Sequence, residues 1–134
     1  MKPFPIALFV FATILFSACT GEAQKTTPPP SSATMQVIQF HNEHRCATCL
    51  KIEELTKKTL SDYFPSIPFS LVNVEEKKNE KMVELFEAFG TSLFLYNPKT
   101  GSKKDLTDFA FMNAGDEKKF EAELKKQIEA FLKS

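Results

Sequence analysis

Apolar runs and amphipathic segments alternate along the chain from residue 35 onward. Two short runs, rich in β-branched and aromatic residues, predict strands, and two segments with apolar residues every three or four positions predict helices. Pro65 and Pro68 end the first helix, and Gly90 ends the second. In chain order these strand and helix segments are 35–40, 46–63, 69–74 and 80–89.

The second half of the chain predicts a hairpin and a closing helix. The continuous apolar run 93–96 is typical of a buried strand, and the turn residues 97–101 separate it from a polar edge strand at 102–106. Residues 116–132 repeat apolar positions at helical spacing, with Asp116 as a candidate N-cap. The order β-α-β-α-β-β-α predicts an α/β domain with one mixed four-stranded sheet flanked by helices.

The segment between the edge strand and the last helix is apolar but short. We expect Phe109 to Ala114 to form a loop that either packs against the fold as a plug or, exposed near the site, recognises a partner.

The first 34 residues have a different composition. Lys2 precedes the apolar run 3–16 and the small residues Ser17 and Ala18, which is the order of an export signal with its cleavage site. We therefore expect residues 1–18 to be a signal peptide, 19–34 to be a flexible linker rich in Pro, Ser and Thr, and 35–134 to be the folded domain.

Cys19 follows Ser17-Ala18 as the lipidated cysteine follows the lipobox of bacterial lipoproteins, and the N-terminus resembles such a signal. This resemblance implies that lipid on Cys19 anchors the protein to a membrane of the cell envelope, facing the periplasm or the exterior. An ordinary signal-peptide residue at position 19, or an uncleaved anchor, is the alternative.

The charge balance argues against a nucleic-acid partner. The chain has 17 basic and 17 acidic residues, and cleavage before Cys19 would remove Lys2, leaving 17 − 1 = 16 basic residues and a net charge of −1. Nucleic-acid-binding domains carry a basic surplus. We therefore expect no nucleic-acid partner.

Cys46 and Cys49 lie where the first predicted strand gives way to the first helix. Two cysteines with this spacing on a first helical turn can form a disulfide, and the helix N-terminus stabilises a thiolate on the first. Arg45 and His44 add positive charge that lowers the pKa of Cys46, whereas Glu43 and Glu53 oppose it, so the sign of the net effect stays open. The pattern predicts a redox-active dithiol.

The Cys-x-x-Cys motif at a strand-to-helix junction, within this order of elements, resembles the thioredoxin fold in a minimal form over residues 35–132. Residues 40–50 are most similar to small exported thioredoxin-like proteins labelled as the nitrophenyl compound nitroreductase subunit ArsF family. The resemblance implies thiol–disulfide exchange, with Cys46 as the nucleophile and Cys49 as the resolving thiol. We expect a monomer whose partner is a protein thiol or disulfide, with no cofactor.

Several positions depart from the thioredoxin pattern. The chain has no Trp, and Ala47-Thr48 stand between the cysteines in place of Gly-Pro. Gln39 occupies the place of a buried acidic residue that assists proton transfer in thioredoxins. Thr91, followed by Ser92, occupies the place of the cis-proline that presents substrate and excludes metals, and we expect a trans peptide there.

Two alternatives remain open. His41, His44, Cys46 and Cys49 supply two imidazoles and two thiolates within nine residues, a ligand set that suits zinc or copper. The chain could also be an accessory subunit of a reductase with a vestigial dithiol.

Overall fold

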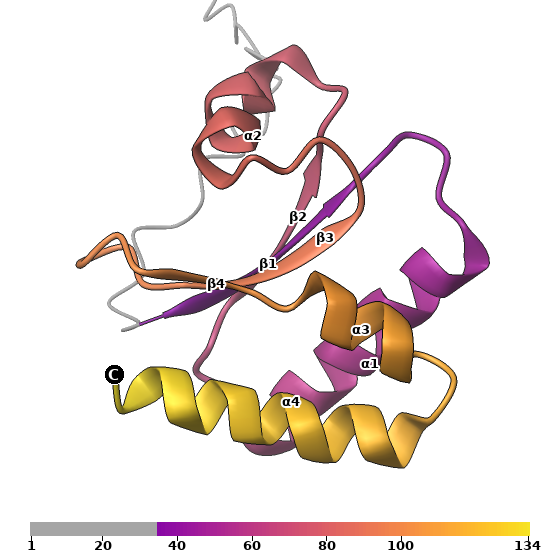
Figure 1. Cartoon of the computed structure of the whole chain (residues 1–134), viewed down its shortest axis with the longest axis vertical. Helices are drawn as coiled ribbons and strands as arrows, with labels where there is room; N and C mark the ends of the chain where they lie inside the picture. Colours follow the sequence, from indigo (N-terminus) through magenta and orange to yellow (C-terminus); the bar gives the residue numbers. More distant parts are fainter. Residues whose placement is uncertain (1–34) are drawn as a thin grey trace, which may run out of the picture.

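A four-stranded mixed sheet lies at the centre of the computed structural model, which describes residues 35–134 (Figure 1). The strand order is β2-β1-β3-β4, with β1 parallel to β2 and antiparallel to β3, and β4 antiparallel to β3. The predicted α/β class, in a minimal thioredoxin-like arrangement, is confirmed. The strands are β1 (Gln36–His41), β2 (Phe69–Asn73), β3 (Ser92–Tyr96) and β4 (Lys103–Asp105).

Helices cover both faces of this sheet. Helix α2 lies on one face, and α1, α3 and α4 lie on the other (Figure 1). The α-helices are α1 (Ala47–Tyr63), α2 (Glu80–Phe86), α3 (Thr107–Asn113) and α4 (Glu117–Leu132), and a short 3₁₀ helix, η1 (Lys77–Asn79), leads into α2.

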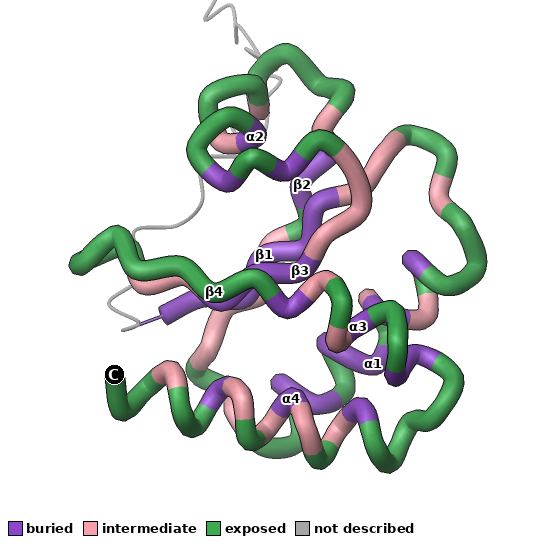
Figure 2. The backbone as a smooth tube through the Cα atoms, in the orientation of Figure 1, coloured by how far each residue is buried: buried purple, intermediate pink, exposed green. Residues whose placement is uncertain are grey.

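The central strand β1 contributes side chains to a hydrophobic core on each face of the sheet, because successive side chains of a strand point to opposite faces. Val37 packs with α1, α3 and α4, whereas Ile38 and Phe40 pack with α2. All three side chains are inaccessible to solvent. Figure 2 shows that most of β1 and the middle of β3 are buried, whereas the helices carry many exposed residues.

Helix α2 ends earlier than the sequence predicts. The predicted helix ran to Phe89, with Gly90 as its terminator, but the last helical residue is Phe86 and Glu87 adopts a left-handed conformation at φ 53°. The Ala88 N–H then donates to the Val83 carbonyl at 3.0 Å, which satisfies an end carbonyl as a glycine-terminated helix would. The consequence is that Phe89 leaves the core and is 76% exposed.

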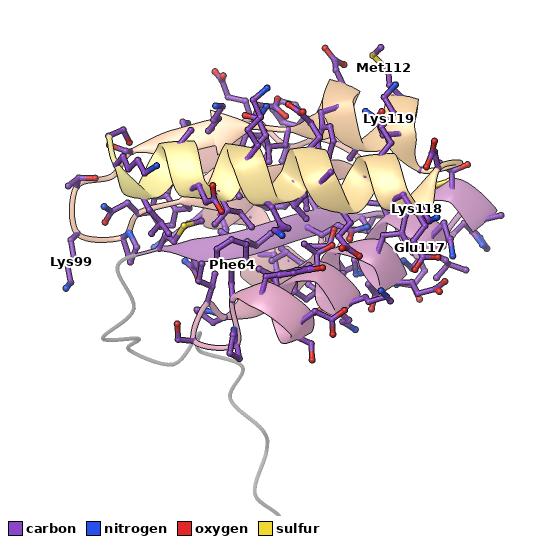
Figure 3. All side chains as sticks on the ribbon, turned by 90° about the horizontal axis from the view of Figure 1, so that it is seen from below. Phe64, Lys99, Met112, Glu117, Lys118 and Lys119 are labelled. Carbon is purple, nitrogen blue, oxygen red and sulfur yellow. A yellow bond between two sulfur atoms is a disulfide. The ribbon has the colours of Figure 1, made fainter. Side chains whose placement is uncertain are left out.

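The predicted loop at 109–114 is wrong, because this segment forms most of α3. The Asp105 carboxylate accepts a hydrogen bond from the Thr107 N–H at 2.8 Å, which satisfies a free donor of the first turn. Phe109 packs on the Phe120 ring of α4, with centroids 5.1 Å apart, while Met112 projects outward (Figure 3). The plug and the exposed apolar surface, posed as alternatives, are thus the two faces of one helix.

The predicted start of the last helix is confirmed. The Asp116 side chain accepts the Lys119 N–H at 3.1 Å and caps α4. Among residues 35–134, no helix is both long and apolar enough to cross a membrane. The predicted signal peptide, the linker and Cys19 lie outside the described residues.

Phe86, the last residue of α2, and Phe89, three residues after it, test where this helix ends. Phe86 is 3% exposed and contacts the rings of Phe40, Phe94 and Tyr96. We expect Phe86→Ala to lower the free energy of unfolding by about 3–5 kcal/mol through the cavity it leaves. Phe89→Ala should change it by less than about 1 kcal/mol, as for an exposed position. Denaturant unfolding of both variants checks this, and equal losses would contradict the assigned end of α2.

Candidate functional site

The cysteine pair sits on a loop that is tied to the neighbouring strand. Between β1 and α1, the Glu43 N–H donates to a carboxylate oxygen of Glu75 at 3.1 Å, and the Asn73 side chain donates to the Glu43 carboxylate at 2.6 Å. Asn73 is the last residue of β2. These contacts hold the loop against the carboxyl ends of the two parallel strands, and α1 begins from this fixed point.

Cys46 is the N-cap of α1. Its backbone is extended, and its sulfur accepts a hydrogen bond from the Cys49 N–H at 3.1 Å. A disulfide joins Cys46 to Cys49, whose Cα atoms are 5.2 Å apart. The predicted pairing is therefore confirmed, with Cys46 one residue before the helix. After reduction, the same N–H and the helix N-terminus would stabilise a thiolate on Cys46.

The two sulfur-bearing residues differ sharply in accessibility. Cys46 is exposed, whereas Cys49, at the first turn of α1, is only 5% exposed. A visiting thiol or disulfide can therefore reach Cys46 but not Cys49. This asymmetry is what a nucleophile and a resolving thiol require.

Two side chains from other elements approach Cys49. Gln39, fully buried on β1, donates from its amide nitrogen to the Cys49 carbonyl oxygen at 2.9 Å. Its own amide oxygen has no hydrogen-bond partner among the described residues. Thr91, the residue immediately before β3, places its hydroxyl oxygen 3.4 Å from the Cys49 sulfur. The sequence singled out Gln39 and Thr91 as departures from the thioredoxin pattern, but it did not predict their contacts with Cys49.

The other residue of the predicted substrate-facing loop plays a local part. The Ser92 hydroxyl donates to the Gly90 carbonyl at 3.2 Å, and no hydrogen bond joins it to either cysteine within residues 35–134. The described residues contain no cis peptide bond, so Thr91 follows a trans peptide as expected. Thr91 is thus the member of this loop that meets the pair.

Arg45 forms its ion pair with a carboxylate of α1. Its guanidinium forms an ion pair with Glu53 on α1, and its two remaining nitrogens are buried without a partner among the described residues. His44 is exposed on the loop. Neither side chain donates a hydrogen bond to Cys46 in the described part of the chain. The backbone N–H of Cys49 is therefore the direct donor to the Cys46 sulfur.

Glu53 belongs to a small charged network beside the site. Burial raises the pKa of the Glu53 carboxyl, but hydrogen bonds from Lys57 and Arg45, with their positive charges, outweigh it and hold that pKa below its ordinary value of 4.5. The carboxylate is therefore ionised at neutral pH, and it cancels much of the field that Arg45 would exert on a Cys46 thiolate.

The proposed metal ligands do not converge. No group of three or more His, Cys, Asp or Glu side chains within residues 35–134 is placed to hold a metal ion. The two sulfurs are joined to each other, and the His41 ring nitrogen Nδ1 lies 2.9 Å from the Asn42 carbonyl oxygen. The set His41, His44, Cys46 and Cys49 is thus not a ligand cluster in this arrangement.

A hollow of about 340 Å³ adjoins the cysteine pair. It is lined by residues from the first turns of α1 and from α3 and the segment after it: Ala47, Thr48, Lys51, Phe111, Ala114 and Gly115. Met112, next to Phe111, is 82% exposed. The sequence indicated an exposed apolar segment here as one of two alternatives, but it did not predict that a helix, α3, presents it.

Comparisons with known proteins do not assign the chain to a family. No protein-family model matches it, and no curated protein matches it. A solved structure described as "Structure of a malarial protein" is 22% identical, with a TM-score of 0.42 over 60% of this chain and 96% of that chain. A similarity this low supports no conclusion about the function of this chain.

The Glu53 network predicts a specific acid sensitivity. Because the pKa of Glu53 is lower in the folded than in the unfolded chain, its contribution to stability is present above pH 4.5 and is lost as the pH falls through the folded value. We expect the melting temperature of Glu53→Gln to lie below that of the parent protein at neutral pH, and this gap to close as the pH falls well below 4.5.

Glu54→Gln is the matched control. Glu54 is the adjacent carboxylate, and its side chain is 66% exposed and paired with Lys51. Exposed pairs of this kind contribute little, so this variant should show almost no gap at any pH. A Glu53→Gln gap that stays constant from neutral to acid pH would refute the assigned network.

Proposed function

We propose that this protein performs thiol–disulfide exchange with a protein partner through Cys46 and Cys49. The observation that carries the proposal is the pairing of an exposed N-cap cysteine with a buried one in a single disulfide. The thioredoxin-like strand order supports it, since that fold holds the pair at a strand-to-helix junction. A fold alone does not imply an activity, and the geometry of the cysteine pair is therefore the main support for this function.

The exchange has two steps. A partner thiolate attacks the Cys46 sulfur, forms a mixed disulfide with it and releases Cys49 as the leaving thiolate, which takes up a proton. A second partner thiolate then attacks the partner sulfur of the mixed disulfide and releases Cys46. Two electrons pass from the partner dithiol, which becomes a disulfide, to the cysteine pair. The reverse sequence oxidises the pair and reduces a partner disulfide.

The proposal also covers the cellular compartment of the protein and its attachment to a membrane. An exported protein meets an oxidising compartment in which a cysteine pair cycles through its disulfide. We propose that residues 1–18 direct export and that lipid on Cys19 holds the domain at the cell envelope, facing the periplasm or the exterior, as a monomer. The resemblance to the ArsF-type nitroreductase subunits stays a prediction.

Single cysteine variants test the exchange. In a Cys19→Ser background, we expect Cys49→Ser to react quickly with a small disulfide and to accumulate a mixed disulfide on Cys46. Cys46→Ser should react at least about tenfold more slowly, because Cys49 is buried and lacks the helix N-cap position. Mass spectrometry of the adducts and the rate of thiolate release measure both.

The outcome also separates the rival functions. The parent protein should show two thiols that appear on mild reduction and disappear on reoxidation, without bound metal. Zinc or copper bound in stoichiometric amount to the reduced protein, and lost in Cys49→Ser, would replace the proposal by a metal site. A pair that neither oxidises nor reduces reversibly would leave the vestigial dithiol of an accessory subunit.

Anchoring has its own test. When cells expressing the full chain are fed a labelled fatty acid, the protein should carry the label and partition with membranes. Cys19→Ser should lose the label, whereas Cys46→Ser, the control, should keep it. Label that persists in Cys19→Ser would refute lipidation at this cysteine and would leave the exchange proposal untouched.

A further inference from the structure

The buried cysteine has a proton to lose in every oxidation of the pair. When a reduced pair resolves a mixed disulfide, Cys49 must become a thiolate before it attacks the Cys46 sulfur. Cys49 is 5% exposed, so water has little access to it. The fully buried Gln39 beside it carries an amide, which holds the Cys49 carbonyl but cannot accept a proton at any ordinary pH.

Thr91, unlike Gln39, places a hydroxyl group beside the Cys49 sulfur. Its hydroxyl oxygen lies 3.4 Å from the Cys49 sulfur, and Thr91 itself is partly exposed, so it links the buried sulfur with the solvent side of the loop. A disulfide sulfur carries no proton, so in this state the hydroxyl is the donor. A hydroxyl can also accept, and it can therefore serve both the thiol and the thiolate.

We propose that Thr91 is a positioning residue for the resolving step, and that its hydroxyl stabilises the Cys49 thiolate. The proposal rests on the thiol–disulfide exchange proposed above. In the mixed disulfide, the Cys49 thiol donates to Thr91 and passes its proton to solvent. The hydroxyl then donates to the thiolate, which attacks Cys46, forms the Cys46–Cys49 bond and expels the partner thiolate, and this takes up a proton from solvent.

The other polar groups around Cys49 do not replace Thr91. Glu53 lies one turn further along α1, but its carboxylate is held by Arg45 and Lys57, which lower its pKa and make it a weak base. His41 is two residues from Gln39 on the same face of β1, with its Nδ1 atom at the Asn42 carbonyl. Among the described residues, Thr91 is the side chain within hydrogen-bond distance of the Cys49 sulfur.

Two variants at one position separate the hydroxyl from its packing. Thr91→Val keeps the branched shape and removes the hydroxyl, whereas Thr91→Ser keeps the hydroxyl and removes a methyl group. Each full-length variant, in the Cys19→Ser background, is reduced and mixed with an aromatic disulfide whose leaving thiolate is coloured. The first release of colour reports attack by Cys46, and the second, independent of probe concentration, reports resolution by Cys49.

We expect Thr91→Val to slow the second release roughly tenfold at neutral pH, because a hydrogen bond to a charged group is lost. The first release should change by less than about twofold, since the donor to Cys46 is the Cys49 N–H. Thr91→Ser should keep both rates near those of the parent protein. Equal second rates in the parent protein and Thr91→Val, or equal slowing by both variants, would overturn the proposal.

A second measurement does not need turnover. In a Cys46→Ser background, thiolate absorbance against pH gives the pKa of Cys49, and Thr91→Val should raise that pKa by about one while Thr91→Ser leaves it in place. If the parent protein fails to exchange disulfides, the proposed function falls, and this titration still decides the role of Thr91. An unchanged pKa in Thr91→Val would overturn that role.

Discussion

The hydrogen bond from the Gln39 amide to the Cys49 carbonyl joins the central strand to the cysteine pair. Strand β1 is hydrogen-bonded on both sides, to β2 and β3, and its side chains are buried on both faces. Such a strand has little freedom to move. By fixing the first turn of α1 against this strand, the bond determines where both sulfurs lie relative to the Thr91 loop and the surface.

The two apolar cores give this central strand its rigidity. On one face, the Phe40, Phe86 and Phe94 rings contact one another edge-on or tilted, and on the other face β1 packs under α1 and α4. Aromatic pairs of this geometry contribute beyond the area they bury. The site thus lies beyond the end of a strand that is buried on both faces, whereas Met112 on α3 and Phe89 are exposed.

Most elements of the fold are encoded in the local sequence pattern. Periodicity located every strand and the long helices, and Asp116 was recognised as the cap of α4 because its side chain acts on the next few residues only. The end of α2 and the existence of α3 were missed. The local pattern of apolar residues shows the cause of neither. Helix α2 ends because Glu87 adopts a left-handed conformation, and α3 is held by the packing of Phe109 on Phe120 of another helix.

For the site, the sequence by itself determined the cysteine pair, its place at a helix start, and the absence of an acidic residue and a proline at positions 39 and 91. These are matters of residue identity and local spacing. Only the tertiary structure decided that Cys46 is exposed and Cys49 is buried. It also decided that Arg45 forms an ion pair with Glu53, and that the Thr91 hydroxyl lies near the Cys49 sulfur. The physical reason is that burial and contact between residues 42 positions apart exist only once β3 lies beside β1.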